Sequence, residues 1–211
     1  MIKIGIKIGP LSDIKEFEKT IPYADFIELY GSSGFSYSFV KKYKKPVVVH
    51  APNYGQCINY ANSCKEAGNL ESLTWAIKTA NEFKSDKIIV HSELIESECC
   101  SIENTINFLK KNFDPRLHIE NMPYSSMGHV HIGASTQDIK RIIDETGVKF
   151  CLDLSHAAEY AAFVKKDYNK VIKDFLDFRP NHFHLSDSNL GAVFDENFDE
   201  VHLNFFKGNI D

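Results

Sequence analysis

The sequence predicts an α/β fold, a TIM (β/α)8-type barrel that lacks the last strand and helix. Short apolar runs recur along the chain, and amphipathic stretches with helical spacing separate most of them. Five of these runs end on a residue that can bind a metal, namely His50, His91, Glu120, Asp153 and His184. The endings are about 30 to 40 residues apart, which is the length of one strand plus one helix in a barrel repeat. Because barrel strands are parallel, their last residues meet at one mouth, where barrel active sites lie.

Seven strands are expected, and each is read from one apolar run. The helices between them are predicted from apolar residues three or four positions apart, such as Leu73 and Ile77. Ser135 followed by Asp138 resembles a capping box at a helix start, and Gly147 suits the end of that helix. The expected strands cover residues 2–8, 25–30, 46–50, 87–91, 116–120, 149–153 and 182–186.

A single domain is expected over residues 1–211, since this length can bury a sizeable core and no linker or low-complexity tract interrupts the alternation. Seven strands leave the predicted barrel open. Two unpaired strand edges are an aggregation hazard. The expectation is therefore that a longer chain, a local rearrangement or a partner covers the gap, and oligomerisation is one way to do so.

The composition excludes several classes of protein. The formal net charge is −5, so no broad basic surface for nucleic acid is expected, although bound metal ions could offset this charge locally. The longest apolar runs are far shorter than the ~20 residues that cross a bilayer. The first residues alternate like a strand and carry no signal-peptide pattern. Five cysteines without framework spacing favour a reducing compartment, and the prediction is a cytoplasmic protein without a membrane span.

Three further residues extend the strand endings to a set of eight candidate metal ligands. His156 follows Asp153 by three positions, and Glu200 and His202 are two apart in an extended segment, so their side chains share a face. Mixed imidazole and carboxylate donors favour zinc, manganese or iron over magnesium or calcium. Eight ligands exceed the need of one tetrahedral ion. A cluster that Glu120 bridges could stabilise both oxygens of a phosphoryl displacement. The full ligand set is His50, His91, Glu120, Asp153, His156, His184, Glu200 and His202.

The remaining histidines near the predicted mouth are interpreted differently. His118 and His182 lie two residues before strand endings and are expected to be structural. His129 and His131 are expected in a loop.

Several short motifs follow one another in an order that is similar to a known family. They are His50-Ala51-Pro52, Ile58-Asn59-Tyr60-Ala61, Ile119-Glu120-Asn121, Cys151-Leu152-Asp153-Leu154-Ser155-His156-Ala157, His184-Leu185-Ser186-Asp187 and Gly208-Asn209-Ile210. With these motifs the chain resembles the endonuclease IV family, which belongs to the wider xylose-isomerase-like barrel superfamily. The Glu-Asn and Asp-x-x-His pieces are common to the superfamily. His50, His91 and the Glu200-x-His202 pair resemble the ligands of the endonucleases' three-zinc cluster.

The resemblance implies up to three zinc ions, with manganese as the alternative metal. The first ion would be held by His50 and His91 with Glu120 bridging, the second by Asp153 and His184, and the third by His156, Glu200 and His202. Glu120, Asp153 and His156 are the candidate catalytic residues. The chain departs from the family in two places. Glu200 stands where the family has Asp, and the family's last Glu ligand has no counterpart, with Glu93 as the nearest substitute.

The implied function is a metal-dependent phosphodiester hydrolase that cuts DNA at abasic sites in DNA repair. The first alternative is a sugar isomerase or epimerase, which would use one divalent metal on Glu120, Asp153 and His184, with carboxylates or His156 moving protons. It would leave His50, His91 and His202 without a role. The second alternative is a non-catalytic truncated barrel. The substrate stays open between abasic DNA, another nucleic acid, a small phosphoester and a sugar.

Overall fold

The structure is a computed structural model that describes residues 1–32, 34–126, 128–190, 203 and 206–210. The chain divides into two compact units. The first unit is Met1–Ile58 with Ala67–Val90, and the second unit is Asn59–Glu66 with His91–Asp211. Whether the two units fold as the single domain expected over residues 1–211 stays a prediction.

The first unit contains four parallel strands in the order β1-β2-β3-β4. They are β1 (Gly5–Ile8), β2 (Phe26–Tyr30), β3 (Val47–His50) and β4 (Ile88–Val90). The helices are α1 (Ile14–Thr20), α2 (Glu66–Phe83, whose first residue belongs to the second unit) and the 3-10 helices Ile21–Tyr23, Ser38–Tyr43 and Tyr54–Gln56. Strands β3 and β4 are buried throughout, as parallel strands covered on both faces should be.

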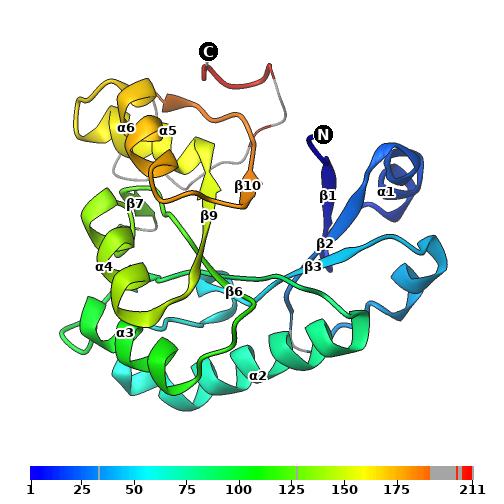
Figure 1. Cartoon of the computed structure of the whole chain (residues 1–211), viewed down its shortest axis with the longest axis horizontal. Helices are drawn as coiled ribbons and strands as arrows, with labels where there is room; N and C mark the ends of the chain where they lie inside the picture. The colour runs from blue at the N-terminus through cyan, green and yellow to red at the C-terminus, as the bar shows by residue number, and fades with distance from the viewer. Residues whose placement is uncertain (33, 127, 191–202, 204–205, 211) are drawn as a thin grey trace. The chain divides into compact units, whose positions relative to one another are not determined.

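The second unit contains the parallel strands β6, β9 and β10, which are neighbours in that order. A separate antiparallel sheet has the order β5-β8-β7. In Figure 1, α3 lies beside α4 and α5 beside α6. The bounds are β5 (Leu94–Ile95), α3 (Ile102–Lys111), β6 (Leu117–Glu120), β7 (Ser125–Ser126), β8 (His129–His131), α4 (Thr136–Thr146), β9 (Lys149–Asp153), α5 (Leu154–Phe163), α6 (Tyr168–Leu176), β10 (His182–His184) and the 3-10 helix Ser63–Lys65.

The seven parallel strands confirm the predicted α/β, TIM-barrel-like fold. Each expected strand is present, with its ends shifted by a few residues at most. The predicted start and end of one helix are also found, because Ser135 caps α4 through Asp138 and Gly147 ends it in the left-handed conformation. The antiparallel sheet is a correction, since His129 and His131 form strand β8 instead of a loop. The ring of His131 is held by Ser126, whose Oγ lies 2.7 Å from Nε2.

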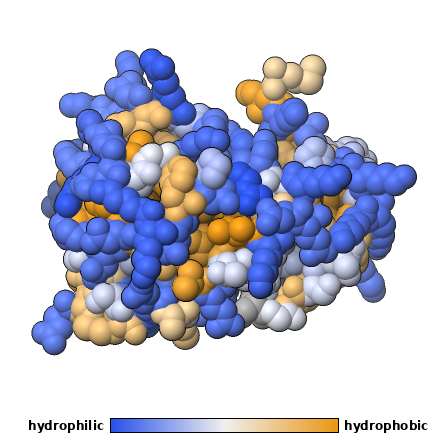
Figure 2. Space-filling view, turned by 60° about the horizontal axis from the view of Figure 1, so that its bottom comes forward, coloured by the Kyte–Doolittle hydropathy of each residue, from blue (hydrophilic) through white to orange (hydrophobic). Residues whose placement is uncertain are grey.

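Hydrophilic side chains cover most of the face seen in Figure 2, with smaller apolar areas between them. This agrees with the 25% of charged residues in the chain. None of the helices in the described part of the chain combines the length and the apolar character that a membrane-spanning helix requires.

A polar network in the second unit explains one of the short sequence motifs. The Asn59 amide donates to the carbonyl of Leu94 at 2.9 Å and to Glu96 at 3.0 Å. The same Glu96 oxygen accepts from Asn62 at 2.8 Å and lies 2.8 Å from Lys65 Nζ. Burial raises the pKa of Glu96, but the hydrogen bonds from Lys65, Asn62 and Asn59 outweigh it and lower this pKa to about 2. The network ties residues 59–65 to the segment that follows β5.

We expect Glu96→Gln to destabilise the protein in a pH-dependent way. Because folding lowers the pKa of Glu96 from 4.5 to about 2, its contribution is complete above pH 4.5 and is lost as the pH falls towards 2. The free energy of unfolding should therefore drop by about 2–3 kcal/mol near neutral pH. Urea unfolding at several pH values measures the difference from the unsubstituted protein, which should shrink on acidification. Glu98→Gln, at an exposed neighbour, is the control. A difference that does not change with pH would contradict this account.

None of the five cysteines, all of which the structure describes, takes part in a disulfide bond, which agrees with the sequence analysis. The adjacent residues Cys99 and Cys100 differ in their surroundings. The Sγ of Cys99 lies 2.7 Å from the Sγ of Cys64, whereas the Sγ of Cys100 lies 3.6 Å from the hydroxyl of Ser97. Sequence spacing could not have indicated the Cys64–Cys99 neighbourhood, because 35 positions separate the two residues.

Candidate metal centre

Strand register brings predicted ligands of the second unit onto one face. Strand β9 pairs with β10 so that Asp153 is opposite His184, and with β6 so that Glu120 is opposite Cys151. Partners in register, and residues two apart on one strand, point to the same side of a sheet. Glu120, Asp153 and His184 therefore share a side. Both carboxylate side chains are 2% exposed, and that of His184 is 11% exposed.

The carboxylate of Glu120 is the centre of this arrangement. Its Oε1 lies 2.9 Å from Nδ1 of His184 and 3.6 Å from Nδ1 of His156. Its Oε2 lies 3.3 Å from Nε2 of His91. Three imidazoles that follow or belong to three different strands thus surround one buried carboxylate.

The two carboxylate oxygens of Asp153 have different contacts: one caps a helix and the other faces the candidate site. It is the N-cap of α5, where Oδ1 accepts from the backbone N–H of His156 at 2.9 Å and from the hydroxyl of Ser155 at 2.6 Å. The other oxygen, Oδ2, lies 3.9 Å from Nδ1 of both His156 and His184. The Asp-x-x-His spacing is therefore the spacing of a helix cap, in which the third residue of the helix carries the imidazole.

The ring of His156 has a fixed tautomer. Its Nδ1 lies 2.7 Å from the carbonyl oxygen of Asn121. A carbonyl only accepts hydrogen bonds, so Nδ1 carries the proton and the lone pair is on Nε2. Backbone carbonyls commonly orient metal-binding histidines in this way.

The Asn121 side chain joins the ends of two strands. Its Oδ1 accepts from the backbone N–H of Asp153 at 2.7 Å, and its Nδ2 donates to the carbonyl of Asp153 at 2.9 Å. This pair of bonds continues the β6–β9 ladder by one residue and places Glu120 beside Asp153. The Glu-Asn motif in the sequence thus consists of one candidate ligand and the amide that holds its neighbour.

His91 stands between two carboxylates, Glu120 and Glu93. Its Nδ1 lies 3.4 Å from Oε1 of Glu93, whose side chain is 2% exposed. Burial opposes protonation of His91, but the attraction of Glu120 and the bonds to both carboxylates raise the pKa of His91 to about 9. A metal ion at His91 therefore has to displace a proton near neutral pH. The backbone of Glu93 has φ 78°, in the left-handed region that side chains rarely adopt. The sequence indicated Glu93 only as a substitute ligand.

Asp187, from the motif that begins at His184, has a structural role. It is 5% exposed and accepts from the backbone N–H groups of Ser188 at 2.9 Å, Gly208 at 2.8 Å and Ile210 at 3.2 Å. Burial raises the pKa of Asp187, but these backbone hydrogen bonds outweigh it and lower the pKa. A Cβ at Gly208 would clash with the carboxylate of Asp187 and the carbonyl of Ser188, so glycine is required there.

The predicted ligands also include His50, Glu200 and His202. In the first unit, His50 ends β3, is 1% exposed and donates from Nδ1 to the carbonyl of Ala51 at 2.9 Å, which leaves the lone pair on Nε2. Glu200 and His202 lie outside the described residues. His118 is structural, as expected, because its two ring nitrogens lie 2.7 Å from the carbonyl of Arg116 and 2.8 Å from Oδ1 of Asn181.

The donor set of the second unit fits a divalent cation. Ligand atoms of Glu120, Asp153 and His156, all three buried, lie within 4.8 Å of one another. Ligands of a tetrahedral zinc ion are about 3.3–3.8 Å apart, so small side-chain adjustments would suffice. Buried carboxylates are costly unless positive charge compensates them, and a metal ion provides that charge.

Comparisons with known proteins agree with this class of fold. The chain belongs to the xylose isomerase-like TIM barrel family, whose pattern it matches over residues 38–211. Comparison with curated protein sequences gives no significant match.

Solved structures with a similar fold include sugar epimerases and a nuclease. A D-tagatose 3-epimerase-like protein has a TM-score of 0.74 and 21% identity, over 100% of this chain and 83% of that chain. Endonuclease IV from Thermus thermophilus has a TM-score of 0.69 and 18% identity, over 98% and 83%. D-psicose 3-epimerase, solved in the presence of D-fructose, has a TM-score of 0.62 and 13% identity, over 87% and 72%. At these identities the likeness shows the fold alone.

Proposed function

We propose that this protein is a metal-dependent phosphodiester hydrolase of the endonuclease IV type that acts on DNA at abasic sites. The supporting observation is the number of imidazoles around Glu120, since His91, His156 and His184 each have a nitrogen within 3.6 Å of its carboxylate. A single-metal isomerase or epimerase site would use Glu120, Asp153 and His184. It would leave His91 without a role, whereas His156 could move protons.

The proposed ligands are those that the sequence indicated, with zinc as the expected metal and manganese as the alternative. Divalent ions in such a cluster would activate water and stabilise the attacking and leaving oxygens of the phosphodiester. Glu120, Asp153 and His156 would hold the metal, with Glu120 shared between two ions. These three are the proposed catalytic residues. The resemblance of the sequence adds His50, Glu200 and His202 to the proposed ligands.

Metal content and DNA cleavage together test the proposal. Protein purified without chelator should contain more than one and up to three zinc or manganese ions per chain by elemental analysis. It should cut a duplex that carries one abasic site and leave the matched intact duplex uncut. One ion per chain, no cleavage and turnover of a ketose would favour the epimerase. A metal-loaded protein without either activity would contradict both readings and leave the non-catalytic barrel.

The His91→Ala variant separates the two enzyme classes. Because His91 lies 3.3 Å from Glu120 and would bind metal only in the multi-ion site, we expect the loss of about one ion per chain. Cleavage should fall by roughly 100-fold or more. His129→Ala replaces a histidine on β8 that belongs to none of the described clusters, and should behave as the unsubstituted protein. Unchanged metal content in His91→Ala would overturn the assignment of this ligand.

A further inference from the structure

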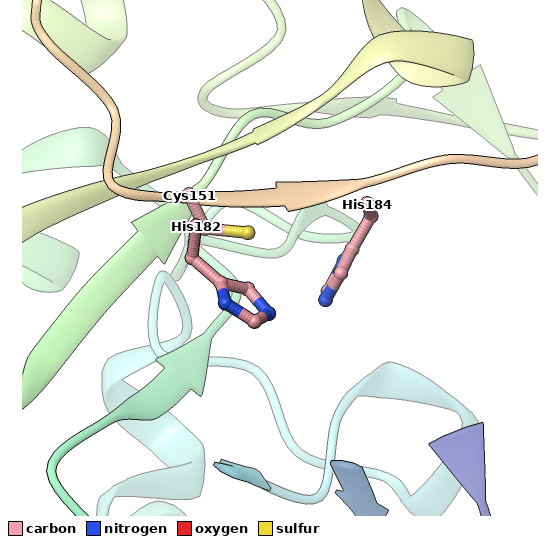
Figure 3. Close-up of side chains that lie close together, drawn as sticks. All are labelled: Cys151, His182 and His184. Carbon is pink, nitrogen blue, oxygen red and sulfur yellow. The ribbon is translucent and has the colours of Figure 1, made fainter. Parts of the chain in front are cut away.

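A second group of metal-binding side chains lies on β9 and β10 of the second unit. Cys151 of β9 is opposite His182 of β10 in the strand register. His184 follows two residues later on the same face, whereas Phe183 between them points outward and is 48% exposed. Figure 3 shows the sulfur of Cys151 and the rings of His182 and His184 turned towards a common space. The alternation of β10 therefore brings two imidazoles to one thiol.

The distances suit a common ion. The ligand atoms of Cys151, His182 and His184 lie within 4.8 Å of one another. Zinc–sulfur and zinc–nitrogen bonds of about 2.3 and 2.0–2.1 Å place neighbouring ligands about 3.3–3.8 Å apart. Closing that difference requires small side-chain rotations and no change of strand register. Cys151 is 0% and His182 6% exposed, so two of the three ligands are buried.

The chemistry of this group differs from that of the carboxylate site around Glu120. One thiolate with two imidazoles is a donor set for thiophilic ions such as Zn²⁺, Cu⁺ and Cd²⁺. Carboxylates accept harder ions as well. Cys151 and His182 distinguish this group from the carboxylate site, since His184 takes part in both, and His182 was expected from the sequence to be only structural.

We propose that Cys151, His182 and His184 form a second metal site that is selective for thiophilic ions. Binding replaces the proton of the Cys151 thiol with the metal, and the proton is released to solvent. The fourth position of the ion would be taken by water or a small ligand. This site does not depend on the proposed hydrolase activity.

Cadmium binding to a single-thiol background tests the proposal. The other four cysteines, Cys57, Cys64, Cys99 and Cys100, are exposed or half-buried and would be replaced by serine, so that Cys151 is the one remaining thiol. Titration with Cd²⁺ alone should produce a near-ultraviolet thiolate-to-metal charge-transfer band that saturates at one ion per chain. Cys151→Ser in the same background should abolish the band.

Two further variants show which residues share the ion. His182→Gln in the single-thiol background should weaken Cd²⁺ binding by roughly tenfold or more, if the imidazole is a ligand. His129→Gln, which makes the same change at a histidine of β8 outside this group, should leave the band in place. Far-ultraviolet circular dichroism would confirm that each variant is folded. Absence of a band in the folded single-thiol protein, a band indifferent to His182→Gln, or a band lost in His129→Gln would each overturn the proposal.

Discussion

Glu120→Gln is expected to remove bound metal and with it the proposed hydrolase activity. The substitution keeps the size of the side chain but removes the charge that lies 2.9 Å from His184 and 3.3 Å from His91. Two ions would lose a shared anionic ligand, so we expect metal affinity to fall by at least about 100-fold. Cleavage of abasic DNA should fall on the order of 10³-fold. Elemental analysis after equilibrium dialysis and a single-turnover cleavage assay measure the two effects.

The matched control is Glu71→Gln, which makes the same change on the exposed face of α2. It should change neither metal content nor cleavage. Thermal unfolding of Glu120→Gln should remain cooperative, since the shape of the buried side chain is kept. Full metal content in the folded variant would show that Glu120 is a structural carboxylate.

Asn121→Ala is expected to cause the largest loss of stability. The alanine would leave the backbone N–H and carbonyl of Asp153 without their partners at 2.7 and 2.9 Å, in a place where Asn121 is 0% exposed. Unsatisfied buried polar groups and the cavity together should lower the free energy of unfolding by about 2–4 kcal/mol. For a chain of this length the melting temperature should fall by about 5–15 °C.

Differential scanning calorimetry measures this loss on protein freed of metal, which separates it from any effect of lost ligands. Asn121→Asp keeps the acceptor but places a carboxylate oxygen against the carbonyl of Asp153, and it should be at least as unstable as the alanine variant. Asn81→Ala on the exposed face of α2 should lie within about 0.5 kcal/mol of the unsubstituted protein. A mild effect of Asn121→Ala, equal to that control, would show that the β6–β9 ladder does not need the amide.

The strands could be predicted from the sequence because each buried parallel strand leaves a short apolar run. The candidate ligands could be predicted because parallel strands end at the same edge, so Glu120, Asp153 and His184 had to lie near one another once the fold was known. Helix α5 was not predicted. It begins directly after β9 without a loop, and its alanines are buried around most of the helix, so no amphipathic pattern marks it. Strands β5 and β7 are two residues long, too short for a detectable alternation.

The roles of individual side chains depended on three-dimensional contacts that spacing does not encode. His118 and His184 both belong to strands of the parallel sheet, yet the ring of His118 is enclosed by Arg116 and Asn181 whereas that of His184 lies 2.9 Å from Glu120. His182 and Cys151 come from strands 31 positions apart, and their neighbourhood required the register of β9 and β10. The two carboxylate oxygens of Asp153 likewise have different roles because one of them caps α5.

The backbone of Glu93 has a consequence for how this protein would respond to selection. A left-handed conformation costs a residue with a side chain about 1–2 kcal/mol compared with glycine. Glu93, whose buried carboxylate lies beside His91, thus has a backbone conformation that glycine adopts at a lower energy. A laboratory lineage propagated only for heat resistance, without demand for catalysis, would tend to accumulate glycine at this position. Lineages required to keep turnover would retain the acid and gain their robustness elsewhere.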